Sequence, residues 1–543
     1  MVEGATPPNE SQAQFVKLLI YARVSFIIWP RGGQRSQGTL DRREFLRYGM
    51  GLAGAGLLSL GLADLASPSL FGQRQPSTSS TSSTSLPSTT TTSSSSSISE
   101  ISSLPDYQAF LSWLQGVSGP YSGKTLDISL EAEFGPYATQ LIDSDFFNAS
   151  GIRDQYDIRP YALQLDAVSL MASTQSSAYD CYSLDVENLG VFPNLPISPY
   201  TLAQQYPDLT YPELNFDDFH RFSWDRIATY PPDLSGGNGG DSAATVTVIP
   251  FDTPTLVLFY RQDVFNKLGL TPPATWDDHF ANCQAIQKSG LTPFGSVSMA
   301  SVSVSVIYEY QAHLASFGGS LWAVDGNTIT PTINTPEGVE ALQDYVRFAP
   351  LSDPASLTYT WDNVFTSLAY ESAACGLLFD GFAQWLEDPQ RGNVAGLMSY
   401  ASMPAGPQGS FHPYAGSGVG VSKYSKNPEM AWLWTQWATS KGAMEAKILG
   451  KYNNFPTRTS VTQVPEIASE LQAGKLGIAD LVNKIWNAGT LTTLLGFPKW
   501  LQAAVIIEGD LSSAFNGSLS PAAALADAQT RVENIGALTF TTG

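Results

Sequence analysis

Residues 246–260 read VTVIPFDTPTLVLFY, an apolar run that is interrupted once, at Phe251-Asp252-Thr253-Pro254. The stretches on either side are rich in β-branched and aromatic residues, so each predicts a strand. The proline and the acidic residue between them predict an irregular elbow, because neither belongs in the middle of a buried strand. We therefore expect two strand halves joined by an elbow, the pattern of a hinge between two lobes.

The segments before this run alternate between strand and helix patterns. Residues 125–130 alternate like a strand, and residues 156–163 and 178–184 predict two more strands. The apolar residues 167–172 predict a helix between the last two strands. Because strand–helix–strand alternation is typical of parallel sheets flanked by helices, we predict an α/β fold.

The segments beside the elbow carry helix and loop signals. A short helix over residues 263–268 should end at Gly269, and Thr275 should cap the next helix, with acidic residues in its first turn. Residues 193–240 are rich in Pro, Tyr and Gly, and this composition predicts a long surface excursion.

Size and charge limit the classes of protein to consider. The chain has 543 residues, which is too long for one ordinary core and predicts two lobes. Charged residues make up only 14% of the chain, and the net charge is −21. A nucleic-acid-binding protein needs a concentrated basic surface, which this sequence does not offer, so we expect no nucleic acid as partner.

The N-terminal region carries an export pattern. Arg42-Arg43-Glu44-Phe45-Leu46 precedes a weakly apolar segment and then a Ser/Thr/Pro tract. Residues 41–66 resemble a twin-arginine signal, a route for folded proteins, and residues 67–104 predict an extended, disordered stalk. We interpret residues 1–40 as an extended signal or a misplaced start. The alternative is a basic patch before a buried helix. We expect an extracellular protein, tethered to the outer face of the membrane if the apolar segment is not cleaved.

Cysteine and histidine do not show a metal or redox pattern in the sequence. Cys181, Cys283 and Cys375 are widely separated, without CxxC spacing, so one disulfide is allowed and none is required. The four histidines, His220, His279, His313 and His412, lack HExxH or similar spacing. We therefore predict neither a metal site nor a cofactor.

Four blocks of sequence, at residues 258–277, 416–432, 455–460 and 520–525, carry recognisable motifs. Together they resemble one family, the extracellular solute-binding proteins of ABC importers, in the sugar-binding group that includes maltose-binding protein. In the first block Arg261-Gln262 replaces the usual Asn-Lys, which puts the detailed contacts of that loop in doubt. The blocks stand in the family's order over roughly residues 125–535. The matching residues are Leu258, Tyr260, Asp263, Phe265, Gly269-Leu270 and 273–277; 416–423 with 425–432; 455–460; and 520–525.

The resemblance implies a type II two-lobe fold, with a mostly parallel sheet in each lobe and ligand held in a hinged cleft. One lobe would take residues 105–255 and 379–428, and the other 256–378 and 429–543. It also implies a function: a monomeric carrier that closes around a sugar or oligosaccharide and delivers it to a membrane permease. Such a carrier has no catalytic residues.

A sugar cleft needs flat aromatic rings for CH faces and carboxylates or amides for hydroxyl groups. Candidate ligand-binding residues of these types follow predicted strands, stand at the elbow, or come from the second lobe. Trp385 is our first choice as a stacking platform, because Gly381 permits close approach just beyond an apolar strand. The candidates are Glu133, Tyr137, Asp185, Asp252, Tyr308, Trp322, Trp361, Asp380, Gln384, Trp385, Tyr414 and Trp500, together with Phe134, Phe251, Phe382 and Phe497.

Two alternatives stay open. The first is a secreted carbohydrate-active enzyme, a glycoside hydrolase or lyase, for which Asp217-Asp218 or Asp277-Asp278 would be the carboxylate pair. Adjacent carboxylates in one segment more often mark a solvated helix start, and no nucleophile elbow or phosphate loop occurs. The second is a carrier of a non-sugar ligand such as iron or a polyamine.

Overall fold

The computed structural model describes residues 104–132, 134–234, 245–450, 455–473 and 477–541. All of them belong to one compact unit of the chain. The predicted export segment, nearly all of the predicted stalk and Glu133 lie outside the described residues. Within the described part of the chain, no helix combines the length and apolar character required to cross a bilayer.

The first sheet has six strands in the order β2-β1-β3-β12-β4, with β5 also paired to β12. β1 pairs parallel with β2 and β3, whereas β12 runs antiparallel to its three neighbours. The predicted parallel arrangement is therefore confirmed for the first three strands. The strands are β1 (Thr125–Glu131), β2 (Arg153–Arg159), β3 (Cys181–Asp185), β4 (Pro196–Ile197), β5 (Ile249–Asp252) and β12 (Ser417–Ser422).

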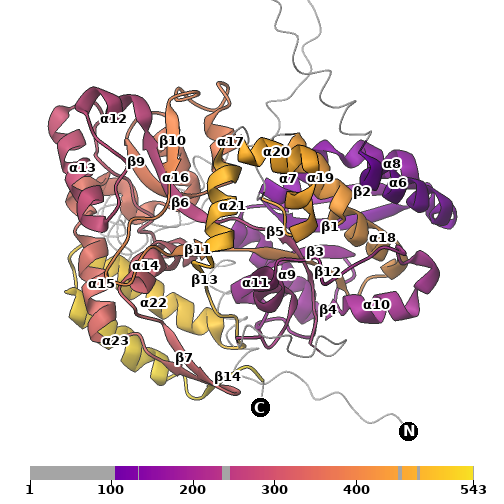
Figure 1. Cartoon of the computed structure of the whole chain (residues 1–543). Coiled ribbons are helices and arrows are strands. Elements are labelled where there is room, and N and C mark those ends of the chain that lie inside the picture. Colours follow the sequence, from indigo (N-terminus) through magenta and orange to yellow (C-terminus); the bar gives the residue numbers. More distant parts are fainter. Residues whose placement is uncertain (1–103, 133, 235–244, 451–454, 474–476, 542–543) are drawn as a thin grey trace, which may run out of the picture. The chain divides into compact units, whose positions relative to one another are not determined.

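The elbow carries the chain from the first sheet into a second one (Figure 1). β5 belongs to the first sheet, and β6 (Leu256–Arg261) is the central strand of the order β10-β6-β9. β9 (Cys375–Phe379) and β10 (Met398–Ala401) both pair antiparallel with β6, so the parallel sheet expected in each lobe is not found here. Smaller sheets are formed by β11 (His412–Tyr414) with β13 (Leu491–Thr493), and by β7 (Trp322–Asp325), β8 (Thr328–Pro331) and β14 (Leu538–Thr539).

Helices accompany both sheets. In chain order before the elbow they are α6 (Pro105–Val117), α7 (Phe134–Leu141), α8 (Asp143–Ser150), α9 (Tyr161–Thr174), α10 (Pro199–Gln205) and α11 (Arg221–Ser223). After the elbow come α12 (Gln262–Leu268), α13 (Trp276–Ser289), α14 (Val304–Ser316), α15 (Pro336–Val346), α16 (Trp361–Ala369), α17 (Phe382–Leu386), α18 (Pro428–Ala438), α19 (Lys441–Leu449), α20 (Pro465–Gln472), α21 (Ile478–Ala488), α22 (Trp500–Phe515) and α23 (Pro521–Glu533).

The core membership of two segments differs from the predicted lobe boundaries. α18 and α19 share a core with α6 and the first sheet, through Trp432, Trp434 and Trp437 among others. They were expected in the second lobe, as part of residues 429–543. Conversely, β10 was expected in the first lobe and pairs with β6 of the second sheet. Each segment packs with the sheet on which it buries its apolar surface. A sequence motif does not show which sheet that will be.

Several local predictions are confirmed. α12 ends at Gly269, which adopts a left-handed backbone with φ of 66°. Thr275 caps α13, accepting from the Asp278 N–H while the Asp278 carboxylate accepts from the Thr275 N–H. The predicted surface excursion at residues 193–240 is wrong, because Leu202, Phe219 and Trp224 of this segment are buried in the core.

Candidate functional site

A cavity lies where the three parallel strands of the first sheet end, beside the strands that cross between the sheets. Glu131 is the last residue of β1, Tyr161 opens the helix after β2, and Asp185 ends β3. Carboxyl ends of parallel strands are where α/β sheets gather their ligands. The cavity is lined by Glu131, Ala132, Phe134, Tyr161, Asp185, Glu187, Pro254, Tyr308, Trp361, Phe379, Phe382 and Ala415.

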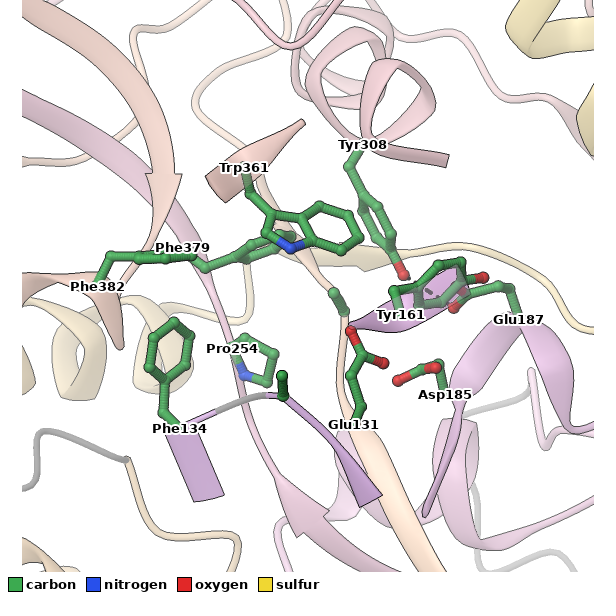
Figure 2. A pocket seen from close by; sticks show the side chains of 12 residues that line it. Glu131, Phe134, Tyr161, Asp185, Glu187, Pro254, Tyr308, Trp361, Phe379 and Phe382 are labelled. Atoms are coloured by element: carbon green, nitrogen blue, oxygen red, sulfur yellow. Dashed lines mark hydrogen bonds between the residues drawn. The ribbon is translucent and has the colours of Figure 1, made fainter. Parts of the chain in front are cut away.

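One wall of the cavity consists of carboxyl and phenol groups (Figure 2). Glu187, in the short helix η5 (Val186–Asn188), accepts hydrogen bonds of 2.9 Å from both Tyr161 and Tyr308. Tyr308 comes from α14, so its bond joins an element after the elbow to one before it. The carboxyl groups of Glu131 and Asp185 point toward each other, and the two side chains are hydrogen-bonded.

Burial changes the ionisation of this wall. Burial raises the pKa of Asp185 well above its usual range, and the nearby Glu187 carboxyl raises it further. Burial also raises the pKa of Glu187, although hydrogen bonds from its own backbone and the two tyrosines oppose that shift. The pKa of each of the two phenols is raised by burial and by Glu187. The wall thus offers hydroxyl donors, carboxyl groups that hold protons readily, and carboxylate acceptors.

The opposite wall is aromatic. Phe134 packs edge-on against Phe382 with ring centroids 4.7 Å apart, and Trp361 packs edge-on against Phe379 at 5.9 Å. Figure 2 shows these rings on one side of the cavity and the acidic residues on the other. A polar wall facing an aromatic wall suits a solute with both hydroxyl groups and CH faces.

The cavity is small in this structure. Its volume is about 20 Å³, room for about one water molecule. A solute larger than water therefore requires the two sides of the cavity to separate before it can enter.

The structure brings five of the predicted residues to this cavity, namely Phe134, Asp185, Tyr308, Trp361 and Phe382. Trp385 lies just behind the aromatic wall, with its ring 5.3 Å from those of Phe134 and Phe382. Tyr137 packs on the other edge of Trp385 at 5.6 Å. Gln384 neighbours Trp385 on α17, and its side chain is half-buried. Trp385 and Tyr137 thus adjoin the cavity through ring contacts, and Gln384 is not among the residues that line it.

Seven further predicted residues do not line the cavity. Asp252 and Asp380 are buried and accept backbone N–H groups of Gly135 and Thr253, and of Thr255, respectively. The Tyr414 hydroxyl lies 3.0 Å from that of Ser223 in the core. Trp322 and Trp500 both pack on Phe497. Aromatic type and position after a strand did not distinguish these core residues from cavity residues. Phe251 is likewise buried in the core.

Three polar residues of the cavity were missed, namely Glu131, Tyr161 and Glu187. The signal for them was present, since each stands at or within two residues of a strand end. The predicted second strand ran to residue 163, whereas β2 ends at Arg159, and this error concealed Tyr161 as the first residue of a helix.

Among the described residues, no cluster of His, Cys, Asp and Glu side chains with metal-ligand spacing lines the cavity. The cluster of this kind that these residues do form lies away from the cavity, on α13 and β9. The twelve lining residues include three carboxyl groups and no lysine or arginine. The arrangement can therefore hold a solute by hydrogen bonds and ring contacts.

Comparisons with known proteins point to one family. Residues 198–445 match the model of the family described as bacterial extracellular solute-binding protein. A probable amino-acid ABC transporter periplasmic-binding protein of Sinorhizobium fredii is 22% identical over 423 residues, which cover 76% of this chain and 90% of the relative.

Two solved structures share the fold. A solute-binding protein of Agrobacterium radiobacter K84 in complex with ribitol has a TM-score of 0.63 at 20% identity, covering 77% of this chain and all of that one. The maltose-bound MalE3 of T. maritima has a TM-score of 0.65 at 16% identity, covering 76% of this chain and all of that one. At these identities the two structures show the two-lobe fold.

Proposed function

We propose that this chain carries a sugar or polyol, held in the cavity described above. The premise is that the chain belongs to the bacterial extracellular solute-binding proteins and is the binding component of an ABC transporter. The observation that carries this proposal is the cavity's two-sided lining, with carboxyl and phenol groups facing aromatic rings. Hydroxyl groups of a sugar bond to the first wall, and its CH faces pack on the second.

The lining argues against an amino acid, although one relative is named as a probable carrier of amino acids. The carboxylate of an amino acid needs a cation or several N–H donors, and none of the twelve lining residues is a lysine or arginine. Asp185 and Glu187 offer carboxyl groups there and no cation. The ribitol and maltose ligands of the two structural neighbours support the choice of a polyhydroxy solute.

A polyamine is the cationic alternative, since three carboxyl groups line the cavity. Two observations disfavour it. Burial raises the pKa of Asp185 and Glu187, which reduces their negative charge. Both oxygens of Glu187 already accept a tyrosine hydroxyl, so this group is partly occupied.

Lobe closure is the proposed mechanism of capture. The hydrogen bond from Tyr308 to Glu187 joins an element after the elbow to one before it, and the small cavity volume requires the two walls to part for entry. A solute that contacts both walls then favours the closed form, because its contacts are complete only there. A permease can distinguish loaded from empty carrier by that difference in conformation.

The finer points of the proposal concern place and chemistry. The twin-arginine-like segment would export the chain, and retention of its apolar part would tether a monomeric carrier to the outer face of the membrane. The carrier would bind without chemical conversion of its cargo. We propose Glu131, Tyr161, Asp185, Glu187, Tyr308 and Trp361 as direct ligand-binding residues, with Trp385 and Tyr137 supporting the aromatic wall.

A screen with product analysis tests the proposal. The full chain is heated with ribitol, maltose and other polyols and sugars, with amino acids, and with polyamines, and every stabilising compound is recovered and analysed. A ligand present at about 100 times its dissociation constant should add about 2.7 kcal/mol to the free energy of unfolding. Stabilisation by a polyol or sugar that is recovered intact supports the proposal. Cleavage of the sugar, or stabilisation by an amino acid or polyamine alone, refutes it.

The variant Trp385→Ala tests whether the aromatic wall contributes to sugar binding. Its ring supports Phe134 and Phe382, so truncation should loosen the aromatic wall and weaken sugar binding. Trp113→Ala is a matched control, since Trp113 packs on Phe110 and Tyr211 in the other core. Equal affinities of the two variants and the unaltered chain would remove Trp385 from the site.

A further inference from the structure

One cluster of potential metal ligands lies apart from the cavity, in the core beside the second sheet. Ligand atoms of His279, Cys283 and Cys375 all lie within 4.8 Å of one another, and all three residues are buried. We infer that these side chains supply three ligands of a zinc site, which the spacing of the residues along the sequence did not indicate. This site does not depend on which solute the cavity takes.

The fold explains why these residues converge. His279 and Cys283 are four residues apart on α13, so both side chains leave the same face of the helix. Cys375 is the first residue of β9, and residue 297 forms a parallel bridge with Gly376 beside it. Gly295 lies against α13, where an added Cβ would stand 2.1 Å from the carbonyl oxygen of Cys283. The absence of a side chain at Gly295 thus lets α13 approach the strand.

The spacing within the cluster suits zinc. The Cys283 sulfur lies 3.7 Å from Nδ1 of His279. Zinc bonds of about 2.3 Å to sulfur and about 2.0–2.1 Å to nitrogen, at angles between tetrahedral and trigonal, place those two atoms about 3.5–3.8 Å apart. The same sulfur lies 3.9 Å from Nε2, so it faces the ring between the two nitrogens. Both the imidazole and the Cys375 side chain must therefore turn to direct their ligand atoms at one metal ion.

Charge and burial favour zinc over other soft ions. Two thiolates and a neutral imidazole exactly balance Zn²⁺, whereas Cu⁺ in the same site would leave a net negative charge in the core. The exposed fractions are 2% for His279 and 0% for both cysteines, so an uncompensated charge would be costly. Trp276 and Phe348 pack against the imidazole.

A metal here would connect two elements that support the cavity. Cys375 opens β9, and Phe379, which lines the cavity, closes the same strand. Zinc bound by α13 and Cys375 would fix this strand against the helix. The expected role is therefore structural, as a cross-link in the second sheet's core.

The test is a metal titration of the full chain. The chain is purified under reducing conditions, freed of metal with a chelator, and titrated with Zn²⁺ in competition with a chromophoric chelator. The unaltered chain should bind one zinc per molecule and melt at a higher temperature with zinc than without. Cys283→Ser and Cys375→Ser should each lose stoichiometric zinc. Cys181→Ser is the control, because that buried cysteine belongs to the other core and should leave the zinc content unchanged.

Two measurements on the unaltered chain keep the inference testable if a variant fails to fold. Co²⁺ in place of Zn²⁺ should give a thiolate-to-metal charge-transfer band, and its absence would overturn the inference. Thiols are also counted after metal removal and unfolding without reductant in a sample never exposed to reductant. Three free thiols support the zinc site, whereas one free thiol would show a Cys283–Cys375 disulfide and overturn it. Retention of copper with rejection of zinc would also overturn it.

Discussion

Tyr308→Phe tests lobe closure through one hydroxyl group. Tyr308, on α14 after the elbow, donates to Glu187, which precedes the elbow, and the exposed fractions of these side chains are only 1% each. If this bond forms when the lobes close around the solute, its loss should weaken binding while the open, unliganded protein keeps its stability. If the bond exists equally in both states, the loss should appear in the stability instead.

The size of the effect follows from the partner. A hydrogen bond to a charged group contributes about 1.5–3 kcal/mol, and one between neutral groups about 1 kcal/mol. Burial raises the pKa of Glu187, so the larger value applies above that pKa and the smaller one below it. The dissociation constant should therefore rise about 10- to 140-fold at high pH and about 5-fold at low pH, since 1.4 kcal/mol is a factor of ten.

Isothermal titration calorimetry with the sugar or polyol found in the screen measures this change. Tyr310→Phe is the matched control, because Tyr310 is buried on the same helix and donates 2.9 Å to the carbonyl of Gly338, away from the cavity. That variant should lose stability and keep its affinity. Equal dissociation constants for Tyr308→Phe and the unaltered chain at all pH values would refute the closure argument.

Three further predictions concern pH and packing. Burial raises the pKa of Glu187 above its ordinary 4.5, so the folded state retains a proton that the unfolded state releases. The free energy of unfolding should therefore fall as pH rises from 4.5 through the folded pKa. Melting curves of Glu187→Gln should show a flatter dependence on pH. Gly381→Ala would place a Cβ 2.0 Å from the ring of Phe134; we expect about 1–3 kcal/mol of lost stability and weaker sugar binding by calorimetry, whereas Gly509→Ala, with open space around it, should lose neither. Trp500→Ala, at 1% exposure, should cost about 3–5 kcal/mol in denaturant unfolding and leave sugar affinity unchanged; a large loss of affinity there would contradict our placement of the site.

The sequence predicted best what local chemistry decides. The cap at Thr275 and the helix end at Gly269 depend on a few neighbouring residues, and both are confirmed. The crossing between the sheets could be predicted because Asp252 and Pro254 interrupt an apolar run that is otherwise continuous. The return strand at residues 417–422 was likewise predicted, and it pairs with β3.

The site could be predicted only in part, because its membership depends on contacts distant in the chain. Trp361 and Trp500 are the same residue type at a helix start, but the first lines the cavity and the second is enclosed by the core. Asp252 stands at the crossing as predicted, yet it accepts the N–H of Gly135. The cluster on α13 and β9 escaped notice because Cys375 is far from Cys283 in sequence. Burial and pairing are tertiary properties, which residue type alone does not determine.

A crystal structure of the protein with its bound sugar or polyol tests the central claim most directly. Our account predicts an intact solute between the carboxyl wall of Glu131, Asp185 and Glu187 and the aromatic wall of Trp361 and Phe379, with the Tyr308–Glu187 hydrogen bond in place. A solute bound outside this cavity, or one cleaved within it, would contradict the account.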